Sequence, residues 1–99
     1  MKSNFQKLIQ TDNLVLIDFS AEWCGPCQTL APILKDVKSD LGDDVKIMKI
    51  DIDKNQAIAN QFSIRSVPTL ILFKNGKEIW KQSGVMTKAD LVRTIKSHQ

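Results

Sequence analysis

The sequence LVLIDFSAEWCGPC, residues 14–27, joins an apolar run to two cysteines that are separated by two residues. Residues 14–19 are apolar on both faces apart from Asp18, a pattern typical of a strand buried in the middle of a sheet. From about Cys27 to Leu41, apolar residues recur at helical spacing, so a long helix is predicted to begin at the cysteines. The cysteine pair is therefore expected where a buried strand ends and a helix begins.

The position of the pair predicts a different chemistry for each cysteine. A thiolate at a helix N-terminus is stabilised by unpaired backbone N–H groups and by the helix dipole, which lower the thiol pKa. We therefore expect Cys24 to be the nucleophile of the pair. Cys27 lies one turn further on and is expected to be more buried, which suits it to resolving the mixed disulfide. Pro26 fits the first helical turn, where its missing N–H costs nothing, and Gly25 lets a substrate approach the backbone closely.

The rest of the chain continues the alternation of strands and helices. Pro32 predicts a kink inside the long helix, and Gly42 is expected to close it. The other predicted elements are a first helix capped by Ser3, a second buried strand at Val45–Asp51, a short helix capped by Asp53, a hairpin of Thr69–Phe73 and Lys77–Gln82 around Asn75-Gly76, and a last helix that begins at Thr87 with Asp90. The predicted fold is α/β, with a central sheet of four strands, helices on both faces, and a right-handed crossover between the first two strands, which are parallel.

Composition and charge exclude several classes of protein. The chain has 99 residues, 42% hydrophobic and 25% charged, which suits one soluble domain over residues 1–99. Its net charge of +3 comes from Lys and Arg interleaved with Asp and Glu, so we expect no nucleic-acid partner. No apolar run approaches the roughly 18 residues of a membrane span, and residues 1–10 lack the apolar stretch of a signal peptide. We therefore expect a cytoplasmic protein with no membrane partner, unless an export signal has been removed.

The cysteine pair has two alternatives to redox chemistry, namely a zinc site and a structural disulfide. A zinc site needs about four ligands, and only His98 near the end of the chain remains to help the two cysteines. In the reducing cytoplasm, a close cysteine pair is more often catalytic or metal-binding than structural. We therefore predict redox chemistry and no metal.

Several short motifs occur in a familiar order along the chain. They are Asp18-Phe19, Ala21-Glu22-Trp23-Cys24-Gly25-Pro26-Cys27, Ala31-Pro32, Ile64-Arg65, Val67-Pro68-Thr69 and Phe73-Lys74-Asn75-Gly76. Over nearly its whole length the chain therefore resembles the thioredoxin family. The resemblance implies a thioredoxin fold with a mixed sheet and a monomeric protein disulfide reductase. It also implies that Cys24 and Cys27 form the redox-active disulfide and that the chain binds no cofactor. The substrates would be proteins that contain disulfides. After each reaction, a thioredoxin reductase that uses NADPH would reduce the Cys24–Cys27 disulfide again.

The same resemblance implies a substrate groove beside the cysteines. Pro68 would follow a cis peptide bond, and the backbone of Val67 would pair with an extended substrate. Trp23, Pro26 and Gly84 would line the groove together with Pro68. Trp23 could instead be a core residue, although a place beside an exposed nucleophile favours a surface role, and Gly84 could be only a turn glycine.

Asp18 and Lys49 are the remaining candidate catalytic residues. A lone carboxylate inside an apolar strand is costly to bury, so a functional reason for Asp18 is expected. We expect it behind the disulfide, on the side of Cys27, with a pKa raised by desolvation and a role in accepting the Cys27 proton. Lys49 matches the family lysine near the buried acid, although it could be a surface residue of an edge strand.

Two departures from the family leave other functions open. Ser20 stands where many bacterial thioredoxins carry Trp, so partner selectivity could differ. The short strand that usually precedes the first helix is missing, so Val45–Asp51 is expected to lie at an edge of the sheet. An apolar edge strand can pair with another chain, which would give weak self-association, but the charges of Lys46 and Lys49 would oppose it. The alternatives are a partner-specific or exported redox protein of the same fold and a non-catalytic binding module.

Overall fold

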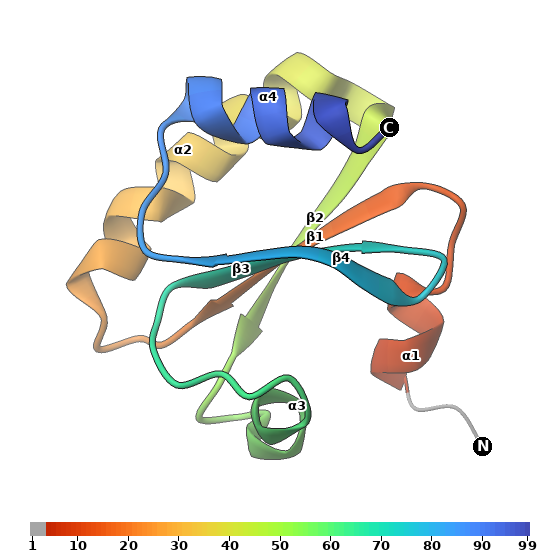
Figure 1. Ribbon diagram of the computed structural model, residues 1–99. Helices are drawn as coiled ribbons and strands as arrows, with labels where there is room; N and C mark the ends of the chain where they lie inside the picture. The colour runs from red at the N-terminus through yellow and green to blue at the C-terminus, as the bar shows by residue number, and fades with distance from the viewer. Residues whose placement is uncertain (1–3) are drawn as a thin grey trace.

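A computed structural model describes residues 4–99 (Figure 1). The elements in chain order are α1 (Asn4–Ile9), β1 (Leu14–Ser20), α2 (Gly25–Leu41), the 3-10 helix η1 (Gly42–Asp44), β2 (Val45–Asp51), α3 (Gln56–Gln61), β3 (Thr69–Lys74), β4 (Lys77–Ser83) and α4 (Lys88–Ser97). This order confirms the predicted α/β fold. The predicted cap at Ser3 lies outside the described residues.

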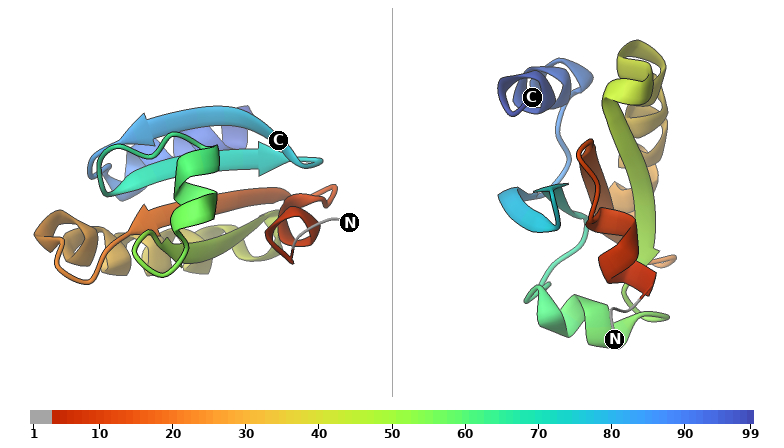
Figure 2. Two further views of the ribbon diagram at one scale, coloured as in Figure 1. Left: turned by 90° about the horizontal axis from the view of Figure 1, so that it is seen from below. Right: turned by 90° about the vertical axis from the view of Figure 1, so that its right-hand side faces the viewer.

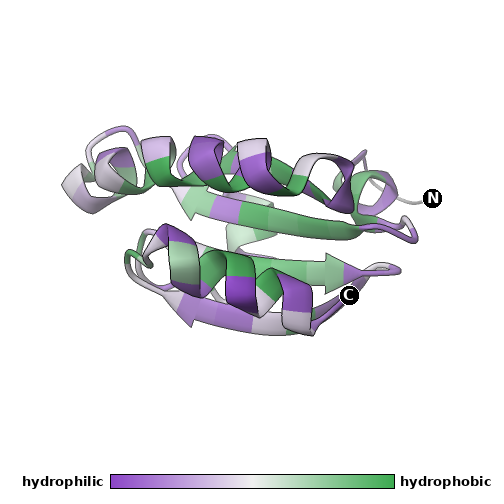
Figure 3. Ribbon diagram, turned by 90° about the horizontal axis from the view of Figure 1, so that it is seen from above, coloured by the Kyte–Doolittle hydropathy of each residue, from purple (hydrophilic) through white to green (hydrophobic). Residues whose placement is uncertain are grey.

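The four strands form one mixed sheet in the order β2-β1-β3-β4. β1 is parallel to β2 and antiparallel to β3, and β3 is antiparallel to β4. Helices α2 and α4 cover one face of the sheet, while α1 and α3 lie over the other (Figure 2). The central strands are hydrophobic along most of their length, whereas the helices carry hydrophilic residues on their outer sides (Figure 3). Both faces of the sheet are therefore covered.

β1 is buried along its whole length because it lies in the middle of this sheet. Its side chains alternate between the two faces. Leu14 and Leu16 pack into the core under α2 and α4, and Val15 and Ile17 pack into the core on the side of α1. By the same alternation, Asp18 lies on the face covered by α2.

Two predicted details of β2 and α3 are wrong. Val45–Asp51 is not a buried strand; it lies at an edge of the sheet, which was the other expectation for this segment, and Val45 is its only buried residue. Asp53 does not cap α3, whose N-cap residue is Asn55. The reason is a turn in which Oδ1 of Asp51 accepts the backbone N–H groups of Asp53 and Lys54, at 2.8 and 3.1 Å, so that the helix begins later.

Other predicted boundaries are confirmed. α2 continues through Pro32 and ends at Gly42, whose N–H donates to the Lys38 carbonyl. In the β3–β4 turn, Asn75 and Gly76 have φ values of 52° and 79°, the positive values that a two-residue turn requires. Oγ1 of Thr87 accepts the N–H of Asp90 at 3.1 Å at the start of α4. Local sequence chemistry therefore determines where these elements begin and end.

Candidate active site

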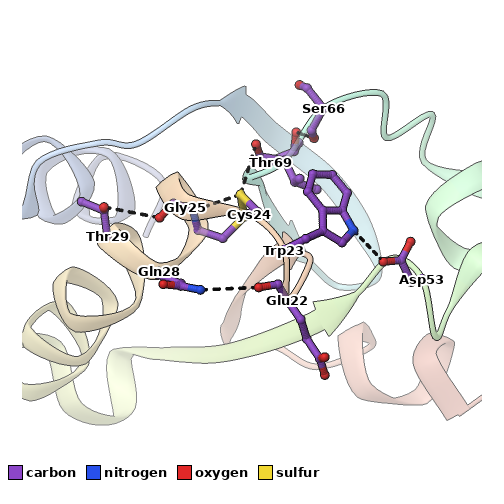
Figure 4. Close-up of a disulfide and its surroundings, with 11 residues drawn as sticks. Glu22, Trp23, Cys24, Gly25, Gln28, Thr29, Asp53, Ser66 and Thr69 are labelled. Atoms are coloured by element: carbon purple, nitrogen blue, oxygen red, sulfur yellow. Dashed lines mark hydrogen bonds between the residues drawn. A yellow bond between two sulfur atoms is a disulfide. The ribbon is translucent and has the colours of Figure 1, made fainter.

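The two cysteines lie at the N-terminus of α2, directly after β1, and form a disulfide (Figure 4). Cys24 is the N-cap residue, with an extended backbone. Its Sγ accepts the backbone N–H of Cys27 at 3.1 Å, so the sulfur takes the position of a capping oxygen. The helix start predicted for Cys24 is confirmed, and the same N–H group would stabilise a thiolate on this sulfur.

Burial does not separate the two cysteines as expected. Cys24 is only 4% exposed and Cys27 2% exposed, so the description of Cys24 as an exposed nucleophile is wrong for the oxidised protein. Both sulfurs belong to a small cluster with Ala21, against which Ile52 and Val67 pack. The difference between the cysteines is therefore their place in the helix.

Trp23 projects from the surface beside the disulfide. The residue is 70% exposed, which excludes a core role. The indole Nε1 donates to Oδ2 of Asp53 at 2.9 Å (Figure 4). Asp53 thus holds an exposed aromatic ring in one orientation, a role that the sequence did not reveal because the two residues are 30 positions apart.

The loop before β3 lies against the sulfur of Cys24. The bond between Val67 and Pro68 is cis, as the resemblance implied, and the Val67 carbonyl oxygen lies 3.7 Å from Sγ of Cys24. The Pro68 carbonyl accepts the N–H of Gly84 at 2.9 Å. Gly84 has a φ of 94°, a backbone conformation that glycine adopts readily and other residues rarely do. Its hydrogen bond connects the start of the loop after β4 to the cis proline.

Asp18 is fully buried, and neither oxygen of its carboxyl group has a hydrogen-bond partner within residues 4–99. Burial raises the pKa of Asp18 from its ordinary value of 3.8 to about 6, although the positive charge of Lys49 opposes this increase. Lys49 is the residue paired with Asp18 across the β1–β2 ladder. The predicted proximity of these two residues is therefore confirmed.

Two open clefts lie along α2, one bordered by Asp18 and the other by Cys27. Asp18 lines a mostly apolar cleft of about 340 Å³ between α2 and β2. Cys27 lines a more polar cleft of about 430 Å³, which Ser20 and Lys54 also border. Lys49 lines both clefts, the one bordered by the buried acid and the one bordered by Cys27.

Two features are absent from residues 4–99. Across that range, no group of three or more His, Cys, Asp or Glu residues is placed so that it could hold a metal ion. None of the helices in the described range has both the length and the apolar character needed to span a bilayer.

Comparisons with known proteins agree with this geometry. A family model described as Thioredoxin matches residues 1–97. Thioredoxin from Chlamydia trachomatis is 47% identical over 98 residues, which cover 99% of this chain and 94% of that protein. Chloroplastic thioredoxin Y from Oryza sativa is 43% identical over 96% of this chain and 57% of that protein. The solved structure of a mutant thioredoxin from Halobacterium salinarum superposes with a TM-score of 0.87 at 35% identity, covering 98% of this chain and 84% of that one.

Proposed function

The chain belongs to the thioredoxin family and is a thiol-disulfide oxidoreductase, and from this premise we propose that it is a general protein disulfide reductase recharged by a thioredoxin reductase. The single observation that carries the proposal is the Cys24–Cys27 disulfide at the start of α2, where a backbone N–H already points at Sγ of Cys24. That arrangement stabilises Cys24 as a leaving group and as a nucleophile.

The proposed reaction has two exchange steps. The Cys24 thiolate attacks one sulfur of a substrate disulfide, a Cys24–substrate bond forms, and the other substrate sulfur leaves as a thiolate. The Cys27 thiolate then attacks Sγ of Cys24, which forms the intramolecular disulfide and releases the second substrate thiolate. Two electrons pass to the substrate. A thioredoxin reductase that takes electrons from NADPH would return the pair to the dithiol form, so the chain itself needs no cofactor.

Asp18 is the proposed acceptor of the Cys27 proton. A buried thiol is a poor nucleophile until it loses its proton, and a carboxyl with a pKa of about 6 is ionised near neutral pH and basic enough to accept it. The positive charge of Lys49 lowers the pKa of Asp18, which supports a role for Lys49 in keeping this carboxyl ionised.

The proposed substrate groove surrounds Cys24 and includes backbone as well as side chains. Its proposed members are Trp23, Gly25, Pro26, Val67, Pro68 and Gly84. The 3.7 Å distance between the Val67 carbonyl and Sγ of Cys24 supports this proposal, because a strand paired with Val67 would bring its own disulfide next to that sulfur. The exposed indole of Trp23 offers apolar contact at the same place.

We further propose that the chain acts as a single domain and a monomer in the cytoplasm. Its small size and the coverage of residues 1–97 by one family model support a single domain. The relative from Oryza sativa is named as chloroplastic, so the compartment needs its own test. Fractionation of the source cells and size-exclusion chromatography would examine compartment and oligomeric state.

One comparison tests the function. The reduction of insulin is followed with NADPH and a thioredoxin reductase, using this chain and its Cys24→Ser variant. Turnover by the parent chain and none by the variant supports the general reductase. A parent chain that is reduced by the reductase but leaves insulin intact would instead indicate a partner-specific redox protein. A parent chain that binds partners but is never reduced would indicate a binding module.

A further inference from the structure

Three side-chain hydroxyls meet beside the loop that approaches Cys24. Oγ of Ser66 donates to Oγ of Ser83 at 3.3 Å, and Oγ1 of Thr69 donates to the Ser66 carbonyl at 2.7 Å. Oγ1 of Thr69 and Oγ of Ser83 are 3.0 Å apart. Figure 4 shows Ser66 and Thr69 next to the disulfide. These hydroxyls therefore lie in the immediate surroundings of the redox centre.

Each hydroxyl has one proton to donate, and this fixes the direction of all three hydrogen bonds. The Thr69 hydroxyl has one proton, and the Ser66 carbonyl can only accept, so that proton is committed to the carbonyl. Ser83 must then donate to Thr69, and it accepts from Ser66. The bonds run from the Ser66 hydroxyl through Ser83 and Thr69 back to the Ser66 carbonyl. We call this closed circuit the hydroxyl ring, and bonds in such a circuit polarise and strengthen one another.

The hydroxyl ring connects the loop to rigid structure. Thr69 begins β3 and is paired with Ser83 at the end of β4, so two members belong to the sheet. Ser66 is the loop residue just before Val67, and both its hydroxyl and its carbonyl are engaged. The loop is held a second time at Pro68, whose carbonyl accepts the N–H of Gly84. Val67 therefore lies between two residues that are each anchored to the end of β4.

We propose that the hydroxyl ring is a positioning device that holds the Val67 backbone at the distance from Cys24 that substrate binding requires. The proposal rests on the proposed function of Val67 in pairing with substrate. Ser66, Thr69 and Ser83 do not touch the reacting sulfurs and act only through the loop. The Thr69 side chain is almost fully buried, whereas Ser66 and Ser83 are exposed, so Ser83 can be changed without opening the core.

Ser83→Ala is the sharpest perturbation, because it removes two of the three links of the ring and leaves Thr69 bonded to the Ser66 carbonyl. Ser83→Thr keeps a hydroxyl at the same place and should restore the ring. Ser97→Ala is the matched control, since it removes a hydroxyl that donates at 2.7 Å to the Thr94 carbonyl on α4. Urea unfolding of all three variants would show that each one folds.

The kinetic readout compares two substrates that differ in their need for the loop. Insulin presents its disulfides on a polypeptide that can pair with Val67, whereas 5,5′-dithiobis(2-nitrobenzoate) is a small disulfide with no backbone. For Ser83→Ala we expect the KM for insulin to rise about 3- to 10-fold with kcat unchanged, which is the usual effect of losing one or two hydrogen bonds. The rate with the small disulfide should stay the same. An insulin KM equal to that of Ser97→Ala, or equal losses with both substrates, would overturn the proposal.

A second measurement does not depend on activity. The amide of Gly84 is bonded to the Pro68 carbonyl, so its hydrogen exchange, followed by NMR in the oxidised protein, reports how firmly the loop is held. In Ser83→Ala the exchange of the Gly84 amide should become about 3- to 10-fold faster, because this variant loses one or two hydrogen bonds that hold the loop. In Ser83→Thr and Ser97→Ala the exchange should remain at the parent rate. Unchanged exchange in Ser83→Ala would show that the ring does not hold the loop. A parent chain that fails to reduce insulin would contradict the proposed function, and the Gly84 amide would still decide whether the ring holds the loop.

Discussion

Replacing Asp18 by Asn should stabilise the protein at alkaline pH and slow its chemistry. The structure gives the magnitude of the first effect. The pKa of Asp18 is raised from 3.8 to about 6 in the folded chain, and the difference of about 2 pH units corresponds to about 3 kcal/mol at 1.36 kcal/mol per pH unit. Because the folded pKa lies above the unfolded one, the ionised carboxylate opposes folding. The penalty is absent below pH 3.8, grows between pH 3.8 and 6, and is complete above pH 6.

Asp18→Asn is nearly isosteric with the protonated acid and removes this penalty. We expect a gain of up to about 3 kcal/mol in the free energy of unfolding at pH 8, which shrinks towards zero near pH 4. Urea unfolding at pH values from 4 to 8, followed by tryptophan fluorescence, would measure it. Asp12→Asn is the control, because it makes the same substitution at an exposed carboxylate. A gain that is the same at pH 4 and pH 8 would refute the desolvation argument.

The second half of the prediction concerns rate. If Asp18 accepts the proton of Cys27, its loss should slow the resolution of a mixed disulfide by roughly 100-fold, the lower end of what general bases contribute. Single-turnover reduction of insulin would show the mixed disulfide persisting in Asp18→Asn while the first attack keeps its rate. Resolution at the parent rate would remove Asp18 from the mechanism even if the stability effect is found.

Three further predictions test neighbouring parts of the site. Cys24→Ser should abolish insulin reduction, whereas Cys27→Ser should make one attack and accumulate mixed disulfides on a non-reducing gel; trapping by Cys24→Ser instead would reverse the two roles. Lys49→Gln removes the charge that opposes the raised pKa of Asp18, so the pH midpoint of mixed-disulfide resolution should move upward, and an unchanged pH–rate profile would contradict the coupling. Gly84→Ala should lower the free energy of unfolding in urea by about 1 to 2 kcal/mol, because a side chain is unfavourable at a φ of 94°. No atom lies within 4 Å of the new Cβ, so a clash would not add to this loss, and an unchanged free energy of unfolding would show that the backbone relaxes.

The residues that could be predicted from the sequence are those whose signal is local. The apolar run of β1 marks a central strand because only a strand covered on both faces lacks polar alternation. The same run makes Asp18 conspicuous, and its burial follows directly. The helix start at Cys24 is equally local, since Pro26 and the following apolar spacing mark the first turn of α2. Position along the chain was sufficient for these features.

Contacts between exposed polar residues could not be predicted in this way. The sequence pattern predicts Asp53 as the N-cap of a helix. In the structure, the Asp51 carboxylate forms a turn, so that α3 begins at a later residue. The Asp53 carboxylate instead accepts a hydrogen bond from the indole of Trp23. Ser66 and Ser83 carry no periodic signal, and their hydroxyls meet only because β3 and β4 are paired. Such contacts join distant parts of the chain, so they become visible only when the register of the sheet is known.

The arrangement of the disulfide explains why a buried acid is retained near it. Cys24 and Cys27 are both almost inaccessible, at 4% and 2% exposed, so accessibility alone cannot make one a nucleophile and the other a resolving thiol. The helix N-terminus supplies a hydrogen bond to the sulfur of Cys24, and within residues 4–99 no hydrogen bond to the sulfur of Cys27 is found. Cys27 therefore needs another group to favour its thiolate, and a base is useful there only if its pKa lies near the working pH. Burial of Asp18 provides that pKa and destabilises the fold by the same free energy, so stability and the rate of resolution should change in opposite directions when the carboxylate is removed.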